Sequence, residues 1–271
     1  MSYPVKAVIF DWAGTMVDFG SMAPVMAMIE AFAAYGVAIT EAEVRRDMGR
    51  AKREHISAIM SVPNVVARWV AANGAVPTTA DEDNIHDALE PLIAEAAMRL
   101  TKLIPGAAEV IADLEKLGVK IGSGTGYTRR TMVGVLPRAA AEGYSPRVVV
   151  CSGETPSGRP APFMTWKALT EMNVWPAQAC VKVDDAAVGI EEGRNAGCWT
   201  IGVAASGNGV GLSLESYRSL TETDRAARVV ASARQLNAAG ADYVIDTVAD
   251  IRPILDEIAA RIIAGDRPAS G

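Results

Sequence analysis

Cysteine is scarce in this chain, with only three among 271 residues. Cys151, Cys180 and Cys198 lie far apart, and each stands in or beside an apolar stretch. This spacing excludes a disulfide framework and the paired cysteines of a zinc-binding knuckle. We therefore predict three buried free thiols and a reducing compartment, which indicates a cytoplasmic protein.

Positive charge and long apolar runs are also in short supply. The chain has 26 lysines and arginines against 32 aspartates and glutamates, a net charge of −6, so we expect no nucleic-acid partner. The most apolar long stretch, VMAMIEAFAAYGVAI, carries Glu30 and Gly36 and is too short to span a bilayer. Asp11 interrupts the only early apolar run, which argues against a signal peptide. We therefore expect no membrane partner either.

Apolar residues make up half of the chain and follow two different patterns. The run KAVIF near the start predicts a buried strand, whereas residues 21–100 are almost wholly helical in pattern. From Pro105 on, helical segments alternate with the predicted strands VKIGSGT, RVVVC, CVKVDD, WTIGVA and DYVIDTV. This alternation predicts an α/β fold with a doubly wound, Rossmann-like parallel sheet. Residues 1–20 and 101–271 would form this core domain, and residues 21–100 a small inserted all-helical domain, the cap.

Polar clusters stand at or just after four predicted strands, and the carboxyl ends of such strands share one crevice. Hydroxyls and arginine bind phosphate, and converging carboxylates need a cation, usually Mg²⁺ beside phosphate. Singly, each cluster could be a turn, a surface ion pair or a helix cap. Glu191 and Glu192 are interpreted as first-turn helix acids rather than ligands. The clusters are Asp11 with Gly14 and Thr15, Ser123 with Thr125, Arg159, and Asp184 with Asp185.

This order of motifs resembles the haloacid dehalogenase superfamily of aspartyl-phosphate enzymes. The stretches FDWAGTMVDFG, MGRAKREHI, IGSGTGYT, GRPAPFM and EGRNAGCWTIGV are similar to its phosphonatase family, over about residues 6–204. The resemblance implies a Mg²⁺-dependent hydrolase that splits the P–C bond of a small phosphonate, phosphonoacetaldehyde, into acetaldehyde and phosphate. An aspartyl-phosphate intermediate and a lysine Schiff base would carry the reaction.

The resemblance also implies roles by position. Asp11 would be the nucleophile that takes the phosphoryl group, and Mg²⁺ would be held by Asp11, the backbone carbonyl of Ala13 and Asp185. The chain departs from the Gly-Asp-x-x-x-Asp form of the superfamily, because Asp184 precedes Asp185 and residue 189 is Gly189. Asp184 is therefore a further candidate ligand. The substrate and its phosphate would be bound by Thr125, Gly126, Arg159 and Met48.

Ala13 stands where related phosphatases carry an acid that protonates an alkoxide leaving group. Cleavage of a P–C bond releases a carbanion instead, and an electron sink stabilises a carbanion. An imine between a lysine and the neighbouring aldehyde is such a sink. The resemblance assigns this lysine to Lys52 in the cap, so the missing acid and the cap lysine explain one another.

The surroundings of Lys52 are predicted from the helical pattern of the segment. A capping box at Thr40 indicates one helix through about Met60. Met48 and His55, at i−4 and i+3 from Lys52, would then share its face, and His55 could shuttle protons during imine formation and hydrolysis. Without the resemblance, Lys52 would be interpreted as a solvated cation of a basic helix, and His55 as a packing residue.

Two alternative functions stay open. A capped phosphatase or phosphomutase of the same superfamily is disfavoured by Ala13, and a non-catalytic phosphonate or phosphate binder by the intact set of candidate catalytic residues. Turnover would separate the three functions. The first helix of the cap, residues 22–35, is richer in methionine and alanine than one cap needs. We therefore expect a homodimer through the cap.

Overall fold

The computed structural model describes residues 3–269, and its centre is a six-stranded sheet in which all neighbouring strands are parallel. The strand order is β3-β2-β1-β4-β5-β6, which confirms the predicted α/β class. The strands are β1 (Ala7–Phe10), β2 (Lys120–Thr128), β3 (Val148–Ser152), β4 (Cys180–Asp184), β5 (Trp199–Val203) and β6 (Tyr243–Ile245).

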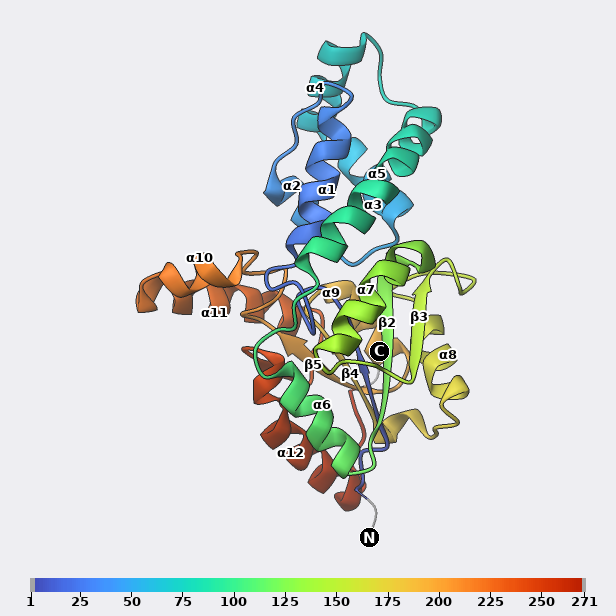
Figure 1. The fold of residues 1–271 in the computed structure, drawn as a ribbon, viewed down its shortest axis with the longest axis vertical. Coiled ribbons are helices and arrows are strands. Elements are labelled where there is room, and N and C mark those ends of the chain that lie inside the picture. The colour runs from blue at the N-terminus through green and yellow to red at the C-terminus, as the bar shows by residue number, and fades with distance from the viewer. Residues whose placement is uncertain (1–2, 270–271) are drawn as a thin grey trace.

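Helices cover both faces of the sheet, because its strands are apolar on both sides. In β1, Val8 and Phe10 join the core on one face, while Ala7 and Ile9 join the core on the other. Figure 1 shows α6 and α12 on one side of the sheet and α8 on the other. One face carries α6 (Ala107–Lys116), α7 (Arg129–Ala141) and α12 (Ile251–Ala264), and the other carries α8 (Phe163–Glu171), α9 (Ala187–Asn195) and α11 (Glu222–Ala238).

Six helices lie between β1 and β2 in the sequence, and the first five of them lie together beyond the carboxyl ends of the strands (Figure 1). Within this cap, α1 packs along α5, and most apolar side chains of α1 are buried, with Met26 the exposed exception among its methionines. The packing of one cap therefore accounts for much of the apolar surplus in α1. The cap helices are α1 (Met22–Ala33), α2 (Glu41–Arg45), α3 (Lys52–Met60), α4 (Pro63–Asn73) and α5 (Thr79–Leu100).

The prediction of a single helix from Thr40 to about Met60 is wrong. The capping box at Thr40 is present, but α2 ends at Arg45 and a new helix, α3, begins at Lys52. Between them Gly49 has a φ of 92°, a left-handed conformation that ends a right-handed helix. The break places Lys52 at the first position of α3 instead of in the middle of a long helix.

The remaining elements are short. They are α10 (Leu214–Ser219) and the 3₁₀ turns η1 (Ala177–Ala179) and η2 (Val248–Asp250). All three cysteines are free and buried, as predicted. Among residues 3–269, none of the helices combines the length and apolar character that a membrane span requires.

Candidate active site

Asp11 stands at the carboxyl end of the central strand. Phe10 lies in register with Ser123 of β2 and Val183 of β4, and the Asp11 N–H donates to the Val183 carbonyl at 2.9 Å. The chain runs outward from β1 through β2 to β3 and then returns to the other side of β1 at β4. Such a switch point is where open parallel sheets bind ligands, so the position of Asp11 follows from the topology.

A pocket at these strand ends is lined by the core and by the cap. The structure brings most of the predicted site residues together there, whereas His55 and Asp184 lie behind the lining. Ser21, Pro24 and Gly49 of the cap and Tyr127 and Ala186 of the core complete the wall. The predicted residues that line it are Asp11, Ala13, Met48, Lys52, Thr125, Gly126, Arg159 and Asp185.

The acidic residues at the floor of this pocket fit a divalent cation. Carboxylate oxygens of Asp11, Asp184 and Asp185 all lie within 4.8 Å of one another, and an all-oxygen donor set suits a hard cation. Burial, followed by the charges of Asp11 and Asp184, raises the pKa of Asp185 well above its usual range. Among the described residues, the buried carboxyl groups outnumber the buried lysines and arginines by two: Asp11, Asp18, Asp184, Asp185 and Glu192 against Lys52, Arg159 and Lys182.

Asp185 is held by a loop that also contacts the cap. Its Oδ2 accepts a hydrogen bond from the backbone N–H of Asn208 at 2.6 Å. The Asn208 side chain donates to the carbonyl of Arg45 at 3.0 Å and accepts from Arg45 Nη1 at 3.2 Å. Gly14 closes over the same carboxylate, with a φ of 83° and space so tight that a Cβ would lie 2.3 Å from Asp185 Oδ2. Asp185 is therefore fixed from both sides.

Asp184 has different surroundings from its neighbour. It is fully buried, and its Oδ2 accepts a hydrogen bond from Lys182 Nζ at 2.6 Å and lies 3.4 Å from Arg159 Nη2. Although burial opposes ionisation, the charges of Arg159 and Lys182 hold the pKa of Asp184 below its ordinary value. A Cβ at Gly189 would lie 2.0 Å from Asp184 Cγ. The Asp184 carboxylate thus occupies the space that a side chain at position 189 would need.

Arg159 is buried and lies near three acids, Asp11, Asp184 and Glu192. Its Nη2 donates to Asp11 Oδ1 at 2.8 Å and to the Gly124 carbonyl at 3.0 Å, and its Nε donates to Glu192 Oε2 at 2.9 Å. The interpretation of Glu191 and Glu192 as first-turn helix acids is wrong, because both residues lie beyond the first turn of α9, and Glu192 is fully buried. The sequence analysis did not predict that Glu192 and Lys182 lie buried beside the site. The lysine inside the apolar strand CVKVDD could have indicated a buried charge.

Lys52 and His55 occupy the cap side of the site. Lys52 is only 9% exposed, so its interpretation as a solvated cation is wrong. Burial lowers the pKa of Lys52 to about 8, against the opposing attraction of Asp11. His55, one turn further along α3, is fully buried, and burial lowers its pKa to about 3. Its Nε2 lies 2.7 Å from the Val44 carbonyl, so a neutral ring donates there.

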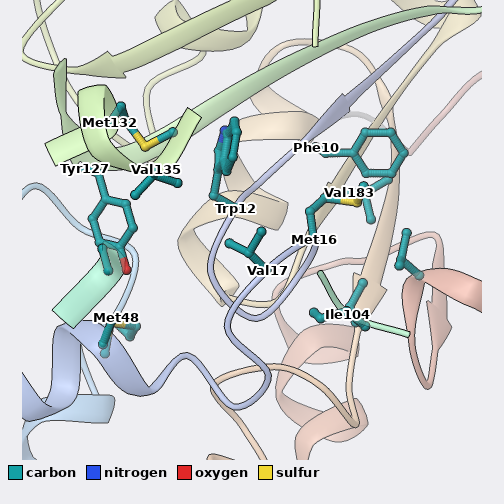
Figure 2. Close-up of a cluster of buried hydrophobic side chains, with 14 of the residues drawn as sticks. Phe10, Trp12, Met16, Val17, Met48, Ile104, Tyr127, Met132, Val135 and Val183 are labelled. Carbon is teal, nitrogen blue, oxygen red and sulfur yellow. The ribbon is translucent and has the colours of Figure 1, made fainter. Parts of the chain in front are cut away.

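Met48 and Tyr127 form the apolar side of the pocket. Figure 2 shows both at the edge of a buried cluster that also contains Trp12. The Tyr127 hydroxyl is buried and has no hydrogen-bond partner within residues 3–269. Trp12 Nε1 donates to Ser123 Oγ at 2.9 Å, so Ser123 is tied into the core instead of facing the pocket. Tyr127 is a pocket residue that sequence reasoning did not identify.

Comparisons of the sequence and the structure with known proteins identify the family of this chain. A family model for haloacid dehalogenase-like hydrolases matches residues 5–197. The phosphonoacetaldehyde hydrolase of Paraburkholderia phytofirmans is 48% identical over 264 residues, covering 97% of this chain and 99% of its own, and that of Aeromonas hydrophila is 44% identical over 266 residues, covering 97% and 95%. A crystal structure of a phosphonoacetaldehyde hydrolase-like protein from Oleispira antarctica superposes with a TM-score of 0.96 at 38% identity, covering 98% of this chain and 96% of its own. The chain therefore belongs to the haloacid dehalogenase-like hydrolases and, within them, to the phosphonoacetaldehyde hydrolase family.

Proposed function

We propose that this enzyme hydrolyses the P–C bond of phosphonoacetaldehyde to give acetaldehyde and phosphate. One observation carries the proposal: the buried amine of Lys52 lines the same pocket as the carboxylate of Asp11, while residue 13 is an alanine. Lys52 can attack a carbonyl carbon, and Asp11 can attack phosphorus. Position 13 carries no acid that could protonate an oxygen leaving group. The names of the relatives support the substrate.

The carbonyl half of the reaction belongs to Lys52. Its neutral amine attacks the aldehyde carbon, and loss of water from the adduct gives a protonated imine. A pKa of about 8 leaves a useful fraction of the amine neutral near pH 7. His55 stays neutral, and no partner is recorded for its Nδ1 within the described residues, so that we assign it to proton transfer during imine formation and hydrolysis.

The phosphoryl half belongs to Asp11. Its carboxylate oxygen attacks phosphorus while the P–C electron pair moves into the imine, which leaves an enamine on Lys52 and an acyl phosphate on Asp11. Water hydrolyses the acyl phosphate. The enamine takes a proton at carbon, and hydrolysis of the resulting imine releases acetaldehyde and the free amine of Lys52. Every atom of the substrate and of one net water molecule is then accounted for.

Phosphate oxygens and the cation would be held by the core. We assign the phosphoryl oxygens to Thr125, Gly126 and Arg159, with Met48 against the carbon chain. We propose that Mg²⁺ is held by Asp11, the carbonyl of Ala13 and Asp185, and that Asp184 supports them from behind. When bound, the cation supplies the positive charge that the buried carboxylates and the incoming phosphonate require.

Two further expectations remain proposals. The enzyme would act in the cytoplasm, and it would be a homodimer through the cap. Exposed Met26 on α1 is compatible with such an interface. A monomeric mass at micromolar concentration, measured by sedimentation or light scattering, would count against the dimer.

Replacement of Lys52 by arginine tests the central step. Lys52→Arg keeps the charge and much of the length, but a guanidinium does not deprotonate in proteins and forms no imine. Activity on phosphonoacetaldehyde should fall by several orders of magnitude, with a native circular dichroism spectrum. Lys167→Arg, at a lysine outside the pocket, is the matched control and should retain activity.

Borohydride trapping locates the covalent intermediate. Borohydride together with phosphonoacetaldehyde should inactivate the enzyme irreversibly, whereas borohydride alone should not, and peptide mapping should place the adduct on Lys52. An active Lys52→Arg variant, or an adduct on Lys120 or Lys167, would contradict the proposal. Preferential turnover of phosphate monoesters would point to the phosphatase alternative, and saturable binding without phosphate release to the binding protein.

A further inference from the structure

We infer that Glu192 is a positioning residue that orients the Arg159 guanidinium toward the phosphoryl group. The inference rests on the proposed function, because that function assigns Arg159 to the phosphoryl oxygens. Glu192 lies in α9, 33 positions along the chain from Arg159, and its side chain is fully buried. Glu192 does not line the pocket, and Arg159 is the one pocket-lining residue among the described residues with which it forms a hydrogen bond, so we infer that it acts on the reaction through Arg159.

Both carboxylate oxygens of Glu192 are used by donors. Oε2 accepts a hydrogen bond from Arg159 Nε at 2.9 Å and lies 3.8 Å from Lys182 Nζ. Oε1 accepts from the Thr165 backbone N–H at 3.0 Å and from the Thr165 hydroxyl at 2.7 Å. Thr165 lies in the first turn of α8, so the carboxylate is anchored at a helix N-terminus, where negative charge is favoured.

This anchored acceptor fixes the rotation of the guanidinium. A guanidinium is planar, and holding Nε determines where its two terminal nitrogens lie. Nη2 then reaches Asp11 Oδ1 at 2.8 Å and the Gly124 carbonyl at 3.0 Å. No hydrogen bond is recorded for Nη1 within residues 3–269, and Arg159 lines the pocket. Nη1 is therefore the group that remains for a phosphoryl oxygen.

Only a carboxylate can do this at position 192. The groups that face Glu192 are all donors: the Arg159 Nε–H, the Thr165 N–H and hydroxyl, and the Lys182 ammonium. A glutamine there would aim its NH₂ group either at Arg159 or at Thr165, and would oppose donor to donor in each orientation. Glu192→Gln should therefore rotate the guanidinium away from its present position.

The experiment measures binding of inorganic phosphate by calorimetry in the presence of Mg²⁺. Glu192→Gln should raise the Kd for phosphate about tenfold and should raise KM for phosphonoacetaldehyde more than it lowers kcat. The matched control is Glu191→Gln, which removes the same charge from the neighbouring, partly exposed position and should leave both constants unchanged. Phosphate binding requires no P–C chemistry, so this test stands even if the Lys52 experiments contradict the proposed function.

Two further variants separate positioning from stability. Glu192→Asp keeps the charge but shortens the reach, and it should also weaken phosphate binding, which keeps the inference testable if the glutamine variant fails to fold. In an Arg159→Lys background, which lacks the planar fork, Glu192→Gln should change the Kd much less than in the wild type. An unchanged Kd with a lowered Tm in a folded Glu192 variant would overturn the inference and assign Glu192 to fold stability alone.

Discussion

Position 13 and position 52 together show how single side chains set the chemistry of this site. A methyl group at Ala13 removes a proton donor from the pocket that Lys52 enters from the other side. Burial lowers the pKa of Lys52 to about 8, and on the proposed function this makes the amine a usable nucleophile. The same burial keeps His55 uncharged.

The pKa of Lys52 predicts how imine trapping depends on pH. Only the neutral amine attacks a carbonyl, so below about pH 8 the trapping rate should fall nearly tenfold per pH unit. Above that pH the rate should level off. Cyanoborohydride trapping followed by mass spectrometry between pH 6 and 10 measures this directly. A rate that still climbs steeply at pH 10 would show a lysine with the ordinary value near 10.4.

Some site residues could be predicted from the sequence and others could not. Asp11 and Asp185 directly follow strands, Thr125 lies within β2 and Arg159 lies in the segment after β3, so short-range pattern and topology place them together. Glu192 could not be found this way, because its partners come from two other segments and its role depends on packing between helices. The sequence around an acidic residue in a helix does not show whether its side chain is buried and hydrogen-bonded or exposed to solvent.

At the scale of elements, the strands followed from their apolar runs, whereas the break between α2 and α3 did not. A lone glycine is tolerated inside many helices, so Gly49 gave no clear stop signal. The tertiary reason is contact with the core: a Cβ at Gly49 would lie 2.7 Å from Val188 Cγ2 and 3.0 Å from Ala186 Cβ. The segment between the two helices is shaped by the surface against which it lies.

This contact predicts that Gly49→Ala impairs the enzyme more than it destabilises the cap. The left-handed conformation costs an alanine about 1–2 kcal/mol. Gly74→Ala is the matched control, because Gly74 has a φ of 80° and nothing within 4 Å of an added Cβ. Tm should fall similarly in both variants, but kcat/KM should fall about tenfold or more only for Gly49→Ala. Equal kcat/KM values in the two variants would contradict a catalytic need for close contact at Gly49.

At the scale of the whole molecule, the cap and the core complete one site around buried charge. An excess of two buried carboxylate charges is destabilising by itself, because ions are poorly solvated inside a protein. The interior therefore lacks positive charge, which a bound divalent cation would supply.

Metal removal should consequently affect both activity and stability. EDTA should inactivate the enzyme, and Mg²⁺ should restore it. At a hundred times its Kd, Mg²⁺ should add about 2.7 kcal/mol, which raises Tm by roughly 5–10 °C in a chain of this size. Scanning calorimetry measures this rise in Tm, and KCl at equal ionic strength is the control for charge screening. Asp185→Asn should reduce the rise in Tm that Mg²⁺ causes. Full activity after exhaustive chelation would contradict the cation site.

Asn208 joins two parts of the protein that otherwise touch the cation site separately. Its backbone holds Asp185, and its side chain holds Arg45 of the cap by two hydrogen bonds. Lifting the cap from the core must break the bonds to Arg45 or disturb the bond to Asp185. Because coupling between two equilibria is reciprocal, whatever free energy a cation gains from a closed cap is also gained by closure from a bound cation. A bound cation would therefore favour the closed cap, and opening of the cap would weaken cation binding by the same factor.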